Sequence, residues 1–123
     1  MVKNIIIVDD EKGVIDSIKA GLEMLDNDMK VTPFKSGKEL FAFLNYSEKP
    51  DLILLDIMMP DMTGWQILER IRNNQDWKNI PIIFLTARKD YVAKHAGSFL
   101  AEDYIEKPFK IPELKEHIDK ILS

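Results

Sequence analysis

The sequence predicts a doubly wound α/β domain, in which helices cover both faces of a five-stranded parallel sheet. Two observations support this fold class. Short runs of apolar, mostly β-branched residues, which are typical of strands buried on both faces, occur along the whole chain. They alternate with segments whose apolar residues recur every three or four positions, as on one side of a helix. This alternation favours a parallel sheet, because each right-handed crossover returns the chain to the same end of the sheet.

The first strand and the first helix follow directly from the pattern. Residues 5–8 form the run IIIV, which stops at two aspartates. Between residues 11 and 25 the apolar side chains change to helical spacing and share one helical face. They are Val14, Ile15, Ile18, Leu22 and Leu25.

The same alternation continues through the middle of the chain. A short second strand is expected over residues 31–34, and a second helix begins near Ser36, whose hydroxyl can cap it. Residues 52–55 (LILL) form the third strand, followed by a loop marked by Pro60 and Gly64 and by a third helix. The apolar residues of the second and third helices are Leu40, Phe41, Leu44, Ile67, Leu68 and Ile71.

The last third of the chain repeats the pattern twice. A fourth strand is expected over residues 80–85, and a fourth helix over 89–99. This helix has the least regular pattern, because its apolar residues are mostly small and Gly97 interrupts it. A short strand around residues 104–105 precedes a fifth helix that carries Pro112 in its first turn. The apolar stripe of the fifth helix consists of Ile111, Leu114, Ile118, Ile121 and Leu122.

The predicted strand order is 2-1-3-4-5, which is carried over from flavodoxin-like doubly wound sheets as a class.

Residues 1–123 are expected to form a single domain, because their 46% of apolar residues provide one continuous core. The net charge of -4 is spread along the chain, so direct binding of nucleic acid is not expected. The absence of cysteine excludes disulfides and thiol catalysis. The apolar run in the first ten residues is too short for a signal-peptide core or a membrane span, so we expect a cytoplasmic protein without membrane association.

Polar residues stand at the ends of four predicted strands. Asp9 and Asp10 follow the first strand, Asp56 the third, Thr86 the fourth and Lys107 the fifth. In the predicted order the first and third strands are neighbours about 4.8 Å apart, so the three carboxylates converge at one edge of the sheet. Carboxylates so close raise one another's pKa unless a cation lies among them. The pattern therefore predicts a site for a hard divalent cation, Mg²⁺ or alternatively Mn²⁺.

The same cluster contains the groups needed for phosphoryl transfer. Asp56 remains free to act as a nucleophile if the cation takes only some of the carboxylate oxygens. The side chain of Lys107 spans about 6 Å and reaches the Asp56 carboxylate or a phosphoryl oxygen from two strands away. Thr86 presents a hydroxyl donor from the adjacent strand. Positioning and charge neutralisation by such groups are the main contributions to in-line phosphoryl transfer.

Four segments resemble the receiver domains of bacterial and archaeal two-component response regulators, and the resemblance spans nearly the whole chain. They are residues 5–11 (IIIVDDE), 54–64 (LLDIMMPDMTG), 85–87 (LTA) and 103–109 (DYIEKPF). The resemblance implies that Asp56 accepts a phosphoryl group from the phosphohistidine of a sensor histidine kinase or a phosphotransfer protein. It also implies that Asp10, Asp56 and the main-chain carbonyl of Met58, together with Asp9, form the Mg²⁺ site.

The resemblance further implies a conformational switch. Thr86 turns toward the phosphoryl group while Tyr104 moves inward, which changes the surface of the fourth helix, fifth strand and fifth helix that controls a downstream protein or an output domain. The peptide bond before Pro108 is expected to be cis. Met58 and Arg88 tune the lifetime of the phosphoryl group in such domains. Because they are not the polar and acidic pair of the fast chemotaxis type, we expect slow self-dephosphorylation and no other catalysis.

The chain departs from the family pattern before Asp103. Leu100 and Ala101 stand where the family usually has Gly-Ala, so the fourth helix is expected to end differently, at Gly97. His95 and His117 lie on polar helical positions without acidic companions at ligand spacing, and we interpret both as surface residues.

Plainer interpretations exist for each residue taken alone. Asp9, Asp10 and Thr86 could be helix caps, Asp56 a turn former, Lys107 a solvated lysine and Tyr104 a core residue. Two other functions fit the sequence less well. A phosphate-independent interaction module of receiver fold would be expected to lack one of the five site residues, and an aspartyl-nucleophile phosphohydrolase requires an acid/base aspartate where this chain has Met58. The sequence leaves open the kinase, the downstream protein, a phosphorylation-dependent homodimer and whether the chain is a stand-alone regulator or part of a larger protein.

Overall fold

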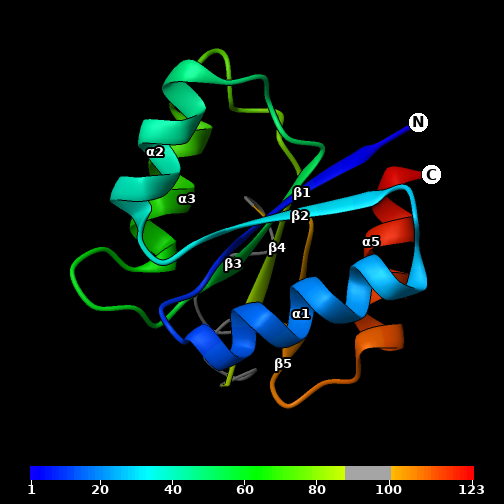
Figure 1. Ribbon diagram of the computed structural model, residues 1–123. Helices are drawn as coiled ribbons and strands as arrows, with labels where there is room; N and C mark the ends of the chain where they lie inside the picture. The colour runs from blue at the N-terminus through cyan, green and yellow to red at the C-terminus, as the bar shows by residue number, and fades with distance from the viewer. Residues whose placement is uncertain (88–100) are drawn as a thin grey trace.

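The computed structural model describes residues 1–87 and 101–123 and contains a five-stranded parallel sheet (Figure 1). The strands pair in the order β2-β1-β3-β4-β5, which confirms the predicted order and fold class. Their bounds are β1 (Lys3–Val8), β2 (Met29–Phe34), β3 (Leu52–Asp56), β4 (Ile82–Thr86) and β5 (Asp103–Glu106).

Three strands begin at residues other than those predicted. β1 starts at Lys3, two residues earlier than expected. β2 starts two residues earlier than expected, at Met29, because pairing with β1 already begins opposite Lys3. β4 starts at Ile82, two residues later than expected. Pro81 precedes it and has no N–H to donate to a strand ladder, although its carbonyl accepts from the Ile53 N–H at 2.9 Å.

The described residues also contain four helices. They are α1 (Lys12–Leu25), α2 (Gly37–Tyr46), α3 (Gly64–Arg72) and α5 (Ile111–Leu122). Ser36 caps α2 as predicted, since its hydroxyl accepts from the Glu39 N–H at 3.2 Å. At the start of α3, Thr63 and Gln66 form a reciprocal capping box. The predicted fourth helix and its end at Gly97 lie outside the described residues.

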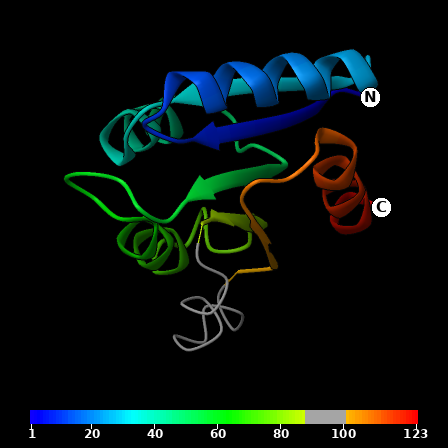
Figure 2. The ribbon, with the colours of Figure 1, turned by 90° about the horizontal axis from the view of Figure 1, so that it is seen from below.

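Side chains alternate between the two faces of the sheet and form two separate hydrophobic layers. The helices that cover the sheet are seen from a second side in Figure 2. From β1, Ile5 and Ile7 pack with α1 and α5 on one face, whereas Ile6 and Val8 pack with α2 and α3 on the other. β3 is buried along its whole length. A strand buried on both faces has no polar position until its end, which is where the first functional candidates occur.

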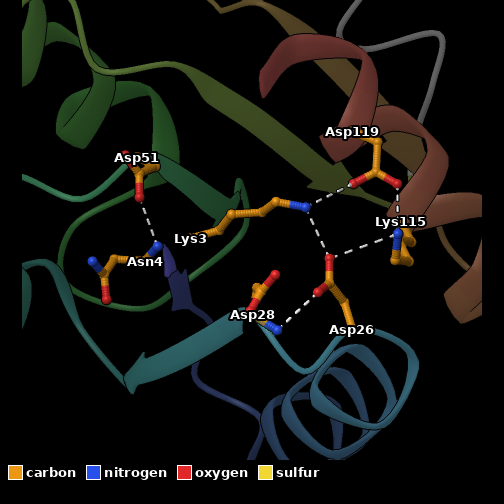
Figure 3. Close-up of polar contacts among 7 residues, drawn as sticks. All are labelled: Lys3, Asn4, Asp26, Asp28, Asp51, Lys115 and Asp119. Atoms are coloured by element: carbon orange, nitrogen blue, oxygen red, sulfur yellow. Dashed lines mark hydrogen bonds and ion pairs between the residues drawn. The ribbon is translucent and has the colours of Figure 1, made fainter. Parts of the chain in front are cut away.

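A group of charged side chains joins three elements at the end of the sheet where β1 begins. Figure 3 shows Lys3 of β1 between Asp26, at 2.9 Å, and Asp119 of α5, at 3.9 Å. Lys115 of α5 contacts the same two carboxylates, at 3.8 Å and 2.6 Å. The hydrogen bond to Lys3 and that from the Asp28 N–H lower the pKa of Asp26 below its ordinary value. These contacts attach α5 to β1 and to the turn after α1, at the end of the sheet opposite Asp9 and Asp56.

Candidate functional site

Three aspartates converge where β1 and β3 end. The two strands are paired in register up to Val8 and Leu55, so Asp9 and Asp56 leave the sheet side by side. One carboxylate oxygen from each of Asp9, Asp10 and Asp56 lies within 4.8 Å of those of the other two. The structure thus brings together the three carboxylates that were predicted to converge. Asp9 and Asp56 are buried, whereas Asp10 is exposed, so the cluster faces solvent on one side only.

Lys107 reaches this cluster from the far side of β4. Its ammonium nitrogen lies 3.0 Å from Asp9 Oδ2 and 3.5 Å from Asp56 Oδ1. The sequence predicted an ion pair with Asp56, and the structure adds Asp9 as the closer partner. The Lys107 backbone is held by a hydrogen bond from its N–H to the Thr86 carbonyl, at 2.6 Å, and the following peptide bond to Pro108 is cis, as predicted.

Asp9 is fully buried and has two partners. Its Oδ2 accepts from Lys107, and its Oδ1 accepts from the Glu11 N–H at 2.9 Å. The second bond resembles the helix-capping role considered as a plainer interpretation, although the N-cap residue of α1 is Glu11 and receives no side-chain cap. A buried carboxylate requires such compensation, because an unpaired charge in the interior is strongly unfavourable. The Asp9 side chain thus stabilises the turn that leads into α1 without capping the helix, and it also belongs to the acidic cluster.

The electrostatics of the cluster leave it with excess negative charge. Burial, followed by the nearby charge of Asp9, raises the pKa of Asp56 from 3.8 to about 6, while Lys107 partly offsets this rise. Burial by itself lowers the pKa of Lys107, but the hydrogen bond to Asp9 and the charge of Asp56 raise it above its ordinary value. One lysine does not neutralise three carboxylates. A divalent cation with oxygen ligands fits this donor set, because it would offset the burial and the carboxylate repulsion that raise the pKa of Asp56.

Thr86 and Tyr104 stand on the two strands beyond Asp56. Asp56 pairs in register with Leu85, so Thr86, the last residue of β4, lies one position further toward the same edge of the sheet. Thr86 is buried, with 2% of its surface exposed. Tyr104 of β5 is half-buried and packs against the hydrophobic layer that contains α2 and α3. Both residues thus lie on the β4–β5 side of the acidic cluster.

The loop between β3 and α3 contains Met58, whose side chain is exposed. The loop is closed at its base by the Gly64 N–H, which donates to the Ile57 carbonyl at 2.8 Å. A Cβ atom on Gly64 would lie 2.5 Å from the Asp56 carbonyl oxygen, so only glycine fits there without displacing the end of β3. In the sequence, Gly64 is recognisable only as a loop residue, because a contact between backbones has no side-chain signal. Arg88 lies outside the described residues.

His117 has a partner that was not predicted. Its Nδ1 lies 2.5 Å from Asp103 Oδ2, and its side chain is 36% exposed, so the prediction of a surface residue without an acidic companion was incomplete. The two residues are 14 positions apart and meet only because α5 packs beside β5. His95 lies outside the described residues.

Comparison with known proteins identifies the family. A model of the response regulator receiver domain matches residues 5–119. The chain belongs to this family. The receiver domain is 35% identical over 121 residues to the response regulator SaeR of Staphylococcus aureus, an alignment that covers 98% of this chain and 50% of SaeR. The chain therefore spans about half the length of the curated relatives it matches.

Solved structures agree with this assignment. The receiver domain superposes on the chemotaxis response regulator CheY4 of Vibrio cholerae with a TM-score of 0.87 and 25% identity, covering 99% of this chain and 100% of that one. It superposes on the response regulator TrrA of Thermotoga maritima, solved in complex with Mg(2+)-BeF, with a TM-score of 0.84 and 31% identity, covering 98% and 100% of the two chains. Within the described residues, none of the helices combines the length and the apolar character that crossing a membrane requires.

Proposed function

We propose that this receiver domain is a phosphorylation-controlled switch whose phosphoacceptor is Asp56. The observation that carries the proposal is the position of the Asp56 carboxylate, which lies at the end of a fully buried strand, among two further aspartates and 3.5 Å from the Lys107 ammonium. A structural aspartate in a turn needs none of these neighbours. The phosphoryl donor is the phosphohistidine of a sensor histidine kinase or a phosphotransfer protein.

In the proposed step, an Asp56 carboxylate oxygen forms a bond to phosphorus while the bond between phosphorus and the donor imidazole nitrogen breaks. The bonding electron pair stays on that nitrogen. Lys107 is close enough to the acceptor to contact the transferred group and to offset charge on its oxygens. Thr86 would donate its hydroxyl to the same group from the end of β4. Asp9 holds Lys107 in this position through the 3.0 Å contact.

Asp9, Asp10, Asp56 and the main-chain carbonyl of Met58 would hold Mg²⁺, or Mn²⁺ in its place. The carboxylate oxygens within 4.8 Å of one another support this assignment. When bound, the ion would neutralise charge on the attacking and transferred oxygens.

Phosphorylation is proposed to act on a partner through Thr86 and Tyr104. Repositioning of these two residues would change the surface that β5 and α5 contribute to, and this surface would control a downstream protein or an output domain. A phosphorylation-dependent homodimer is one form such control could take. We further propose that residues 1–123 form one domain in the cytoplasm, that its only catalysis is slow self-dephosphorylation, and that Met58 and Arg88 set this rate.

The test is incubation with Mg²⁺ and a small phosphodonor, followed by intact-mass measurement. The wild type is expected to gain the mass of one phosphoryl group, and Asp56→Asn is expected to gain none. Asp16→Asn, which changes an exposed aspartate of α1, is the matched control and should be labelled like the wild type. Equal labelling of Asp56→Asn and the wild type would refute the assignment of the acceptor.

The same experiment separates the competing functions. A phosphate-independent module would acquire no label, and a phosphohydrolase would release many equivalents of phosphate per chain. Fluoroberyllate in place of the phosphodonor tests binding without turnover, and Trp65, which packs on Phe84 with ring centroids 4.9 Å apart, provides a fluorescence readout. A half-life of seconds for the aspartyl phosphate would contradict the proposed slow self-dephosphorylation.

A further inference from the structure

β2 is an edge strand of the described sheet, and its backbone groups alternate between β1 and the outside. The carbonyls of Asp28 and Phe34 accept from Lys3 and Asp9, so the even-numbered positions of this segment face β1. The odd-numbered positions, among them Met29, Val31 and Pro33, therefore direct their backbone groups away from the sheet. An edge of this kind is a template on which another strand can pair.

No outward N–H between residues 29 and 35 of this fully described segment is left to donate to such a strand. The Met29 N–H donates to the Asp26 carbonyl at 3.1 Å. The Val31 N–H donates to the Glu23 carboxylate at 2.8 Å, and the Lys35 N–H to the Glu39 carboxylate at 3.1 Å. At the remaining position, Pro33 has no N–H. All four outward positions in succession thus lack a free donor, because three N–H groups are engaged and the fourth residue is a proline.

Val31 is engaged at both of its backbone groups by one pair of side chains from α1. The Lys19 ammonium donates to the Val31 carbonyl at 2.8 Å and also lies 2.9 Å from the Glu23 carboxylate. Figure 1 shows α1 running beside β2, which brings both side chains to the edge. Together they make the two hydrogen bonds that a residue of a neighbouring strand would make. The contacts with Lys19 and with the Val31 N–H also lower the pKa of Glu23, which keeps its carboxylate ionised.

A plainer interpretation is that Lys19 and Glu23 form an ordinary surface pair at helical spacing, and such pairs contribute little to stability. α1 contains a second pair of the same spacing, Lys12 with Asp16 at 3.0 Å, and neither of these side chains contacts strand backbone. The contrast shows what is particular about Lys19 and Glu23, namely that both also bind the backbone of an edge strand. The Lys12–Asp16 pair therefore serves as a matched control.

We propose that Lys19 and Glu23, together with Pro33, close the β2 edge of the sheet against pairing with a second copy of this chain. A second copy is the relevant partner because two identical edges pair with two-fold symmetry, with Val31 opposite the same residue of the other copy. In that antiparallel arrangement the two valines exchange two hydrogen bonds, and these are the bonds that the α1 side chains now occupy. Any association of this receiver domain must then use another surface.

The test removes the side chains that bind the Val31 backbone and measures association through β2 itself. Because the chain has no cysteine, equal amounts of Lys30→Cys and Thr32→Cys chains can be mixed, and each chain then carries one thiol. In the proposed pairing, residue 30 of one copy faces residue 32 of the other with Cα atoms about 4.5 Å apart, which suits a disulfide. Cross-linking is compared in three backgrounds, namely the otherwise wild-type chain, Lys19→Ala/Glu23→Ala and Lys12→Ala/Asp16→Ala.

The Lys19→Ala/Glu23→Ala background is expected to associate through β2 roughly 25-fold more strongly than the other two backgrounds. Each of the two hydrogen bonds that the paired Val31 residues can then form contributes a factor of about five. Adding Pro33→Val to this background provides a second free outward N–H per chain, after that of Val31, and should increase association further. Hydrogen exchange of the Val31 amide in dilute protein should be faster in Glu23→Ala and unchanged in Glu23→Gln, whose side-chain carbonyl still accepts. This readout requires no association and uses single substitutions that preserve the fold. Equal cross-linking in the Lys19→Ala/Glu23→Ala and Lys12→Ala/Asp16→Ala backgrounds, or unchanged Val31 exchange in Glu23→Ala, would overturn the proposal.

Discussion

Replacing Asp56 by Asn is expected to stabilise the metal-free protein at neutral pH. Burial and the charge of Asp9 raise the pKa of Asp56 from 3.8 to about 6, which means that the folded state disfavours the ionised form. Between these two pKa values the penalty reaches roughly 3 kcal/mol. Solvent screening at the open side of the cluster, and the loss of the contact with Lys107, reduce the expected gain to about 1–2 kcal/mol.

The assay is urea unfolding in the presence of EDTA at several pH values. A carboxyl whose folded pKa lies above its unfolded pKa contributes stability below pH 3.8, and this contribution is lost as the pH rises to about 6. The advantage of Asp56→Asn over the wild type should therefore be small near pH 4, increase up to about pH 6 and stay constant above it. Mg²⁺ should reduce the advantage by binding the wild type more tightly. An advantage that does not change with pH, or a variant less stable than the wild type at pH 7.5 in EDTA, would refute this reasoning.

Three further substitutions test other contacts. Lys107→Met should lower the free energy of unfolding by roughly 2–4 kcal/mol in urea titrations, because the fully buried Asp9 loses its cationic partner. Gly64→Ala should cost about 1–3 kcal/mol and slow phosphorylation, because its Cβ would displace the Asp56 backbone. Asp26→Asn should lower the urea midpoint at pH 7 and have less effect as the pH falls below 3.8, because the lowered pKa of this carboxyl contributes stability only where it is ionised.

Each of these predictions has a control or a contradicting result. Gly13→Ala adds the same methyl group where no atom lies within 4 Å, so it should leave phosphorylation unchanged, and an equal loss in both glycine variants would contradict the steric argument. Lys12→Met removes an exposed lysine and should be neutral where Lys107→Met is not. For Asp26→Asn, an effect that does not decrease as the pH falls below 3.8 would contradict the electrostatic explanation.

The site residues that could be predicted from the sequence are those at the strand ends. β3 and β4 are buried along their whole length, and β1 is buried over its last four residues, so the apolar runs of these strands located Asp9, Asp56 and Thr86 at one edge of the sheet. The strand order that makes the first and third strands neighbours was taken from a fold class, and the structure confirms it. The function of these residues as acceptor and switch stays a prediction.

The sequence by itself determined the alternation of strands and helices and the presence of three carboxylates, a hydroxyl and a lysine at the strand ends, because apolar periodicity is a local property of the chain. Only the tertiary structure decided which of these groups touch. The closer pairing of Lys107 with Asp9, the contact of Gly64 with the Asp56 backbone and the closure of β2 by Glu23 all depend on atoms that packing brings together. Such contacts join distant residues or involve backbone groups that every residue possesses, so no local pattern of side chains can predict them.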